Sequence, residues 1–276
     1  MIAMKALAKV NVGLKILDKR EDGFHNIATT LANINLSDFL TFEEMDAGLV
    51  VETKNLELKQ EENLCYQAAE LFIRRYGITK GLKIGLTKNI PVGAGLGGGS
   101  SDAAAVMKGM ARLFNMHIED KELMEMGAEI GLDVPFFIKG GAAYARGRGD
   151  DLRFFRLPRM ELVLYYPGYP IFTKWAYEEY DKTVLTPQPD VDSISRGKKK
   201  KIRKGFELEN SFEKVIFKYH PDLLDVKMNL LGAGVFFASL SGSGSCLYAV
   251  VDSNTRGKVT KYLDGIGATY FEVHTL

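Results

Sequence analysis

Residues 91–101 read PVGAGLGGGSS and lead directly into the helix-forming stretch AAAVMKGMARLF at 103–114. Glycines let backbone amides approach an anion closely, because no Cβ stands in the way. A helix that begins at the end of such a loop adds the partial positive charge of its N-terminus at the same point. The stretch therefore predicts a loop that holds phosphate groups. A flexible linker is the weaker interpretation, because linkers do not usually run straight into a helix.

The spacing inside this loop differs from two common phosphate-binding loops. A Walker sequence needs Gly-Lys-Ser/Thr, whereas this loop ends in Gly-Ser-Ser-Asp. Gly93, Gly95 and Gly98 match G-x-G-x-x-G, but the flanking segments lack the regular βαβ context of a dinucleotide-binding fold. We therefore expect the loop to bind a mononucleotide triphosphate.

The charge balance of the chain argues against a polyanionic partner. Its 36 basic and 35 acidic residues nearly cancel, so no global field attracts nucleic acid or an anionic membrane. No stretch approaches the roughly 18 consecutive apolar residues of a membrane helix, and the N-terminal segment lacks a signal peptide's apolar region and cleavage site. We predict a cytoplasmic protein that binds neither nucleic acid nor membrane. The sequence leaves its oligomeric state open.

The length of the chain favours two domains that share one cleft. At 276 residues it exceeds the usual size of a single core, and clefts between domains often bind small ligands. A shift in composition near Pro158 predicts a first domain at 1–157 and a second at 158–276.

Hydrophobic periodicity predicts a mixture of strands and helices without a regular βαβ rhythm, so the expected fold class is α+β. The predicted strands are 4–17, 27–36, 38–45, 81–88, within 140–156, 161–166, 235–239, 246–251 and 269–274. The predicted helices are 63–76, 103–114, 120–130, 173–181, 209–218, 221–231 and 254–263.

The cysteines, the histidines and the basic run of the chain do not predict a metal site or a polyanion site. Cys65 and Cys246 lie far apart and outside any CxxC spacing, so we interpret both as buried thiols. The four histidines form no local metal motif, and neither zinc nor iron is predicted. The basic run GKKKKIRKG at 197–205 could contact nucleic acid or a membrane, but we interpret it as a solvated loop.

Three motifs in order resemble the signatures of the GHMP kinases, the superfamily of galactokinase, homoserine kinase and mevalonate kinase. The loop at 91–101 is similar to their ATP loop, AKVNVGLKI at 8–16 to an N-terminal signature, and SLSGSGSCLYAVV at 239–251 to a third. The third motif is a glycine turn between two strands, which is expected to close over the loop from the second domain. The resemblance implies a two-domain GHMP kinase fold with its active site in the interdomain cleft, ATP as co-substrate and Mg²⁺.

Two further segments resemble one GHMP family, the diphosphocytidyl-methylerythritol kinases. They are DGFHNI at 22–27 and GLDVPFFIKGGAAYARGRGD at 131–150. The resemblance implies phosphorylation of the 2-hydroxyl of a cytidine diphosphate sugar alcohol, in the methylerythritol phosphate route to isoprenoid precursors. Many members have Tyr where this chain has Phe24. A phenyl ring can still stack on cytosine, although any hydroxyl hydrogen bond is lost.

The same resemblance implies the site residues. They are Lys9 and Asp133 for catalysis, Asn11, Phe24, His25 and Thr173 for the acceptor, and Pro91, Val92, Gly93, Ala94, Gly95, Leu96, Gly97, Gly98, Gly99, Ser100 and Ser101 for ATP.

The chemistry of phosphoryl transfer suits two of these residues independently. Asp133 could accept the hydroxyl proton, and Lys9 could keep that carboxylate ionised while stabilising charge on the reacting oxygens. Each residue also has a structural interpretation when taken alone. Asp133 could cap a helix, Lys9 could be a solvated strand lysine and His25 a packed histidine. Ser100 and Ser101 could contact phosphate, but capping of the following helix is the safer expectation.

Two other functions remain open at this point. Another GHMP kinase, acting on homoserine or mevalonate, would make the DGFH motif accidental. A non-catalytic protein could use the glycine loop for a nucleotide or the basic run for nucleic acid. The presence of both Lys9 and Asp133, together with the near-zero net charge, argues against this last alternative.

Overall fold

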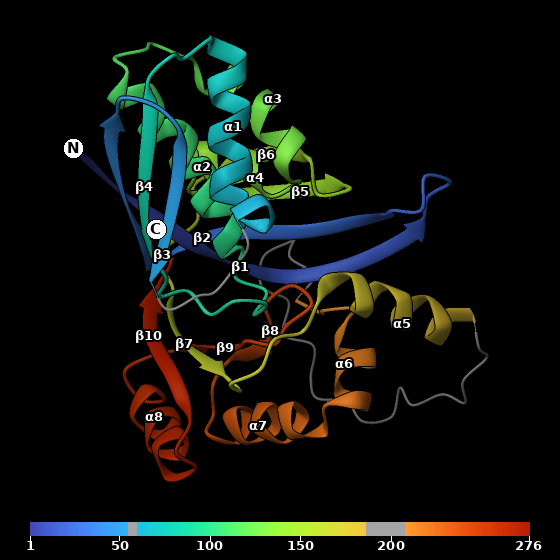
Figure 1. Ribbon diagram of the computed structural model, residues 1–276. Coiled ribbons are helices and arrows are strands. Elements are labelled where there is room, and N and C mark those ends of the chain that lie inside the picture. The colour runs from blue at the N-terminus through green and yellow to red at the C-terminus, as the bar shows by residue number, and fades with distance from the viewer. Residues whose placement is uncertain (55–59, 186–207) are drawn as a thin grey trace.

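The computed structural model describes residues 1–54, 60–185 and 208–276, and its ribbon forms two layered halves (Figure 1). In that view the upper half is a six-stranded sheet with helices on one face, and the lower half is a four-stranded sheet with helices beneath it. The predicted α+β class is confirmed. The basic run at 197–205 lies outside the described residues, so its interpretation as a solvated loop stays a prediction.

One long strand, β2, organises the first sheet. It pairs antiparallel with β1 along its length, with β5 through its first part and with β4 through its last part. β3 then adds parallel to β4, and β6 adds antiparallel to β5. The strands are β1 (Ile2–Lys19), β2 (His25–Met45), β3 (Leu49–Lys54), β4 (Gly81–Thr87), β5 (Ala142–Gly147) and β6 (Asp151–Phe155).

The periodicity predicted two strands, 27–36 and 38–45, where the structure has the single strand β2. The break falls at Ser37, where two consecutive polar residues, Ser37 and Asp38, are both buried. Consecutive buried positions interrupt the alternation that marks a strand with one face toward water. β3 was not predicted, because it is short and largely half-exposed.

Local signals explain where helix α1 begins and ends. The Asn63 side chain accepts a hydrogen bond from the Cys65 amide at 2.9 Å, and Gly77 ends the helix with a left-handed φ of 64°. Helix α2 buries small side chains, including the alanines at 103–105, and this lets it lie close to β1 and β2. The helices of this half are α1 (Leu64–Tyr76), α2 (Gly98–Leu113), α3 (Asp120–Ile130) and α4 (Val134–Lys139), preceded by a 3₁₀ turn at Gln60–Glu62.

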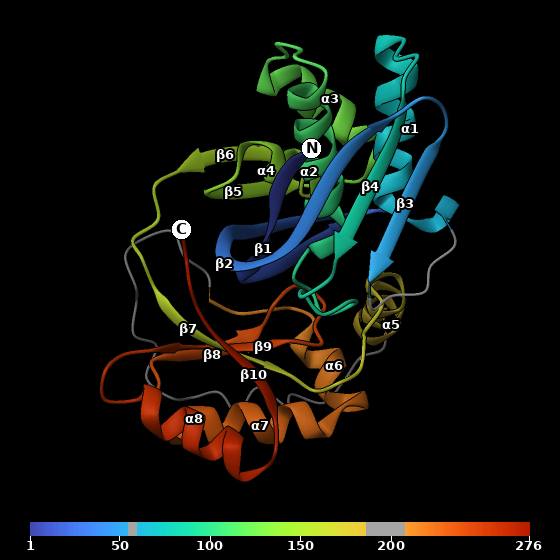
Figure 2. The same cartoon turned by 60° about the vertical axis from the view of Figure 1, so that its left-hand side comes forward.

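The second sheet has the strand order β10-β7-β9-β8 and is antiparallel throughout. Helices α7 and α8 cover its outer face, and Figure 2 shows both on the side away from the first sheet. The elements are β7 (Glu161–Tyr166), α5 (Thr173–Leu185), α6 (Glu213–Tyr219), α7 (Pro221–Gly232), β8 (Phe237–Leu240), β9 (Leu247–Val251), α8 (Arg256–Gly265) and β10 (Thr269–His274).

A shared apolar cluster joins the two halves. Val10 and Ile34 of the first sheet pack with Leu162 and Tyr248 of the second, and all four side chains are buried. The Tyr248 hydroxyl also donates a hydrogen bond to the backbone carbonyl of Asn11 at 2.9 Å. These contacts fix β1 between the sheets, so side chains from the middle of β1 are held at the junction of the halves.

Three smaller expectations can be compared with the structure. Cys65 and Cys246 are both free and buried, as predicted. Among the described residues, no helix is both long enough and apolar enough to cross a bilayer. The predicted domain boundary after residue 157 falls in the connection between β6 and β7, and we propose this connection as the division between two domains.

Candidate active site

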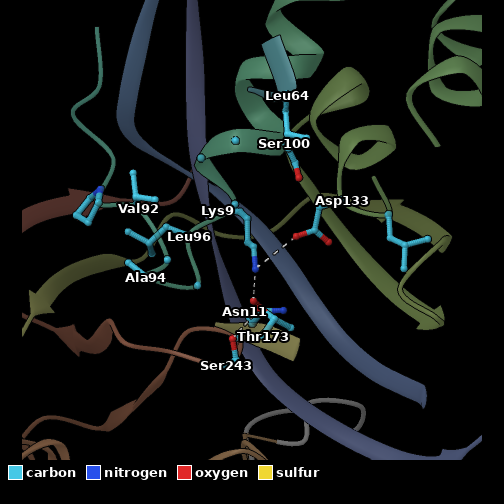
Figure 3. Close-up of a pocket in the computed structure, with 18 of the residues that line it drawn as sticks. Lys9, Asn11, Leu64, Val92, Ala94, Leu96, Ser100, Asp133, Thr173 and Ser243 are labelled. Atoms are coloured by element: carbon cyan, nitrogen blue, oxygen red, sulfur yellow. Dashed lines mark hydrogen bonds and ion pairs between the residues drawn. The ribbon is translucent and has the colours of Figure 1, made fainter. Parts of the chain in front are cut away.

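A cavity of about 550 Å³ lies between the two halves, within the size range of small-molecule sites (Figure 3). Its walls come from β1, the loop between β4 and α2, the turn before α4, the start of α5 and the turn between β8 and β9. Every predicted site residue lines this cavity except Phe24, His25 and Ser101. The chain therefore brings together segments that lie more than two hundred residues apart in sequence.

The glycine loop takes a shape that L side chains rarely adopt. Gly93, Gly95 and Gly97 have φ values of 65°, 75° and 69°, in the left-handed region. At Gly95 a Cβ would lie 1.9 Å from the carbonyl oxygen of Ser241, so only glycine allows the loop and the β8–β9 turn to approach this closely. The sequence requirement for glycine here is therefore both conformational and steric.

Hydrogen bonds join the same loop to the second half of the chain. The Ser241 hydroxyl donates to the Gly95 carbonyl at 2.8 Å, and the Ile171 amide donates to the Gly93 carbonyl at 2.8 Å. The Cys246 amide donates to the Ala94 carbonyl at 3.2 Å. The glycine turn of the second half thus closes over the loop, as its sequence predicted.

Helix α2 starts earlier than the sequence suggested, and this changes the role of the two serines. The helix begins at Gly98, and its N-cap residue is Gly97, which makes no side-chain capping hydrogen bond. Ser100 and Ser101 therefore lie inside the first turn, and neither of them caps the helix. Ser101 faces away from the cavity and donates a hydrogen bond to the Leu7 carbonyl at 2.7 Å. The first hydrogen bond of the helix runs from the Ser101 amide to the Gly97 carbonyl at 2.9 Å, so the amides of residues 98–100 are available to an anion.

Lys9, Asn11 and Asp133 meet at the centre of the cavity, as Figure 3 shows. The Lys9 ammonium donates a hydrogen bond to the Asn11 side-chain oxygen and lies 3.8 Å from a carboxylate oxygen of Asp133. Asn11 in turn donates to the Thr29 hydroxyl at 3.0 Å, which orients its oxygen toward the lysine. Burial lowers the pKa of Lys9, and the attraction of Asp133 offsets that effect only in part.

The structural interpretations of Lys9 and Asp133 do not match this geometry. Lys9 is 5% exposed, so it is not a solvated strand lysine. Asp133 occupies the residue before α4, but its side chain makes no capping hydrogen bond. Its side chain is 37% exposed, and the carboxylate faces the cavity and Lys9 instead.

The two predicted acceptor residues of the DGFH motif, Phe24 and His25, do not line the cavity. Phe24 is 49% exposed, and the Arg148 guanidinium lies 5.4 Å from the centre of its ring. The His25 side chain is buried, stacks on Tyr177 with ring centres 4.7 Å apart, and shares a 2.7 Å hydrogen bond with Asp181. Arg148 and Tyr177 themselves line the cavity. The motif thus reaches the cavity through these two neighbours.

Sequence reasoning missed Tyr177, although one signal could have found it. Tyr177 follows Thr173 by four residues on α5, and residues at that spacing share a helix face. Thr173 lines the cavity at the start of this helix, where its hydroxyl lies 3.0 Å from that of Ser243. A ring one turn later on the same face would be expected in the same cavity.

Comparison with known proteins shows which family this arrangement belongs to. The model for the N-terminal domain of GHMP kinases matches residues 63–141, and the model for the C-terminal domain matches residues 191–265. The 4-diphosphocytidyl-2-C-methyl-D-erythritol kinase of Prosthecochloris aestuarii is 37% identical over 275 residues, covering 98% of this chain and 95% of that protein. The protein of that name from Enterococcus faecalis is 35% identical, covering 100% of this chain and 99% of its own.

This chain belongs to the GHMP kinases, within the 4-diphosphocytidyl-2-C-methyl-D-erythritol kinase family. A crystal structure of 4-(cytidine 5'-diphospho)-2C-methyl-D-erythritol kinase matches with a TM-score of 0.81 at 32% identity, covering 99% of both chains. The mevalonate kinase of Methanococcus jannaschii matches with a TM-score of 0.69 at 16% identity, covering 100% of this chain and 98% of that one, and shares the fold alone. The family resemblance seen in the sequence motifs is confirmed.

The loop geometry predicts the effect of adding one methyl group at Gly97. A Cβ there would lie 2.7 Å from the Phe137 ring and 3.1 Å from the Cε atom of Lys9, at a left-handed φ. We expect Gly97→Ala to weaken ATP binding at least about tenfold, because displacing these groups distorts the phosphate end of the cavity by an energy on the order of 1–2 kcal/mol. Isothermal titration calorimetry measures this directly.

Gly48→Ala is the matched control, since Gly48 has a φ of 87° in the β2–β3 turn and a Cβ there meets nothing within 4 Å. It should lose similar stability through backbone strain and keep wild-type ATP affinity. An unchanged affinity in folded Gly97→Ala protein would contradict the assigned role of the loop.

Proposed function

We propose that this chain transfers the γ-phosphoryl group of ATP to the 2-hydroxyl of 4-diphosphocytidyl-2-C-methyl-D-erythritol. The observation that carries the proposal is the Lys9–Asp133 pair, which lies beside an anion-binding loop in a cavity of small-molecule size. Membership of the family supports the choice of substrate and places the reaction in isoprenoid precursor synthesis.

The amides at the start of α2 are suited to bind the phosphates of ATP. Residues 98–100 present backbone N–H groups that lie before the first helical hydrogen bond, and the helix dipole favours an anion there. The Cβ position of Gly97 lies 3.1 Å from the Cε atom of Lys9, so this end of the helix and the lysine are neighbours. A terminal phosphoryl group bound here would lie between the helix and the Lys9 ammonium.

The reaction then needs a group that accepts the hydroxyl proton. In the proposed step the substrate O–H bond breaks as its oxygen bonds to the γ-phosphorus, the proton passes to the Asp133 carboxylate, and ADP leaves with the electrons of the broken P–O bond. Lys9 stabilises the negative charge that develops on the transferred phosphoryl oxygens. Asn11 holds the Lys9 ammonium in place through its side-chain oxygen.

The residues of the cavity also fit a Mg²⁺ ion bound together with ATP. Among the described residues there is no group of three acidic, histidine or cysteine side chains that could hold a metal alone. Mg²⁺ in nucleotide sites is usually held largely by phosphate oxygens and waters, so bound ATP would itself supply ligands at the cavity. When bound, the ion would neutralise charge on the phosphates.

The cytidine end of the acceptor is assigned to Phe24, His25 and Tyr177, which we call the aromatic wall. Tyr177, which lines the cavity, and the exposed Phe24 offer rings for stacking, and the buried His25 packs on Tyr177 with its Nε2 hydrogen-bonded to Asp181. Arg148, which lies over Phe24 and lines the cavity, suits a diphosphate. These features favour the cytidine acceptor over homoserine or mevalonate, which have no base to stack.

A function as a nucleic-acid-binding protein receives less support. Nucleic-acid binding would not explain why Lys9 is buried at a cavity of small-molecule size. The net charge of +1 also provides no attraction for a polyanion. The absence of nucleic acid among the partners stays a prediction from sequence, as does the oligomeric state.

Replacing Asp133 tests its role in proton transfer. Asp133→Asn keeps the size of the side chain and removes its ability to accept a proton, so kcat should fall at least about 100-fold. Asp46→Asn, at an exposed position in the β2–β3 turn, is the matched control and should keep the wild-type kcat. Steady-state kinetics at saturating ATP and acceptor provide the comparison. A kcat near the wild-type value in Asp133→Asn would assign Asp133 a structural role.

The aromatic wall generates a prediction about acceptor choice. His25→Ala should raise KM for the cytidine acceptor and lower kcat/KM by roughly 10- to 100-fold, because lost positioning energy affects both steps. KM for ATP should stay nearly unchanged. His117→Ala, at an exposed site, is the matched control.

The decisive comparison for the substrate uses truncated acceptors with the wild-type protein. Methylerythritol 4-phosphate, homoserine and mevalonate should all be phosphorylated far more slowly than the full cytidine substrate. Efficient use of any acceptor without cytosine would overturn the proposed substrate and leave the family assignment intact.

A further inference from the structure

A buried charge cluster lies beside the start of α2. It consists of Asp38 on β2, Lys88 just after β4, and Asp102 in the second turn of α2. The Lys88 ammonium donates hydrogen bonds to both carboxylates, with 2.7 Å to Asp102. The side chains of the two aspartates are 0% and 3% exposed and that of the lysine is 8% exposed, so water screens this cluster very little.

The carboxylates of Asp38 and Asp102 differ in the hydrogen bonds that they accept. The second oxygen of Asp38 accepts hydrogen bonds from the backbone amides of Asn89 and Ile90 at 2.5 and 2.8 Å. The second oxygen of Asp102 is buried and has no hydrogen-bond partner among the described residues. An unpaired buried carboxylate oxygen is costly, so of the two aspartates Asp102 is the one that more readily takes a proton.

The cluster borders the cavity at the point where phosphates are expected. Lys88 and Asp102 both line the cavity, and the ammonium lies 3.2 Å from the position that a Cβ on Gly98 would occupy. Gly98 is the first residue of α2. Lys88 therefore lies beside Gly98, and Lys9 lies beside the preceding residue, Gly97. Two buried lysines therefore flank the start of this helix, and only Lys88 is held by two carboxylates.

We propose that Asp102 is a positioning residue that takes up a proton from solvent when ATP binds. Lys88 then has one negative charge beside it instead of two, so its ammonium attracts the nucleotide more strongly. The inference rests on the proposed binding of ATP at the loop. With both aspartates ionised, the cluster carries a net charge of −1 beside an anion-binding helix end. Protonation of Asp102 makes the cluster neutral, while Asp38 still anchors the ammonium.

The charged surroundings of Asp102 favour this response. Lys88 and Asp38 are the charged groups that act on its carboxyl, and the buried Cys65 thiol faces the same cluster from α1. Burial raises the pKa of Asp102 to about 7, an effect that Lys88 offsets only in part. Burial would lower the pKa of Lys88, but the two carboxylates outweigh it and the lysine stays charged. The negative charge of bound ATP should raise the pKa of Asp102 further.

Calorimetry in several buffers counts the protons taken up. ATP with Mg²⁺ is titrated into the protein at pH 8 without acceptor, in buffers of different ionisation enthalpy. At this pH the nucleotide phosphates are already ionised. If binding raises the pKa of Asp102 by about one unit, uptake should be about 0.4 proton per site. Asp102→Asn, which keeps an oxygen for Lys88 but cannot titrate, should bind ATP with uptake close to zero.

Asp46→Asn serves as the surface control and should keep the wild-type uptake. If ATP binds to the wild-type protein with no proton uptake, or if Asp102→Asn shows the same uptake, the inference is wrong while the proposed function stands. If ATP does not bind at all, the proposed function itself fails. If Asp102→Asn does not fold, the absence of proton uptake by the wild-type protein would still overturn the inference.

Stability supplies a second test that needs no ligand. The folded-state pKa of Asp102, about 7, lies above the ordinary value of 3.8 for an aspartate, so the folded state holds this proton over that range. Linkage then requires this group to lower the free energy of unfolding as pH rises from about 4 to 7. In denaturant titrations, the free energy of unfolding of Asp102→Asn minus that of the wild type should therefore increase as pH rises over this range. An identical pH dependence would contradict the assigned proton.

Discussion

The close approach of Gly95 to Ser241 is the constraint on which the site depends. The two backbones come so near that any side chain at position 95 would collide with the Ser241 carbonyl. This contact joins the glycine loop of the first half to the glycine turn of the second, and the cavity lies where they meet. Glycine in this loop therefore allows the two halves to pack closely, which distinguishes the loop from a simple flexible linker.

Burial of positive charge is the second organising feature. Lys9 and Lys88 both lie at the start of α2, and each depends on polar neighbours because burying an ammonium is unfavourable. Lys9 has a neutral amide and a carboxylate 3.8 Å away, whereas Lys88 is bound by two carboxylates. The different partners give the two lysines different roles in our account. The Lys9 ammonium can act on the reacting phosphoryl group. The effect of the Lys88 ammonium on the nucleotide depends on whether Asp102 is protonated.

Much of this site could be predicted from sequence, because its central parts are contiguous motifs. The loop, the AKVN segment and the turn before α4 each carry their chemistry within a few residues, and the structure brings them to one cavity. The class of fold followed from the mixture of periodicities. The continuity of the long strand β2 did not, because two consecutive buried polar residues, Ser37 and Asp38, interrupt the alternation at the predicted break.

Features that depend on tertiary packing could not be read from the sequence. Asp38, Lys88 and Asp102 are far apart in the chain and each fits its local element, so no spacing marks them as a cluster. Ser101 belongs to the loop motif, yet the helix begins early enough to turn its hydroxyl toward β1. His25 likewise lies in a recognisable motif, but only the packing of α5 against it reveals its burial under Tyr177.

The central claim is that the Lys9–Asp133 site directs one phosphoryl group to one hydroxyl. The most direct measurement is the position of the new phosphate in the product, determined by ³¹P and ¹³C nuclear magnetic resonance after reaction of 4-diphosphocytidyl-2-C-methyl-D-erythritol with ATP. The account predicts a single product with phosphate on the 2-hydroxyl, formed in equal amount to ADP. Phosphate on another hydroxyl, or ADP formed with free phosphate and no phosphorylated acceptor, would contradict it.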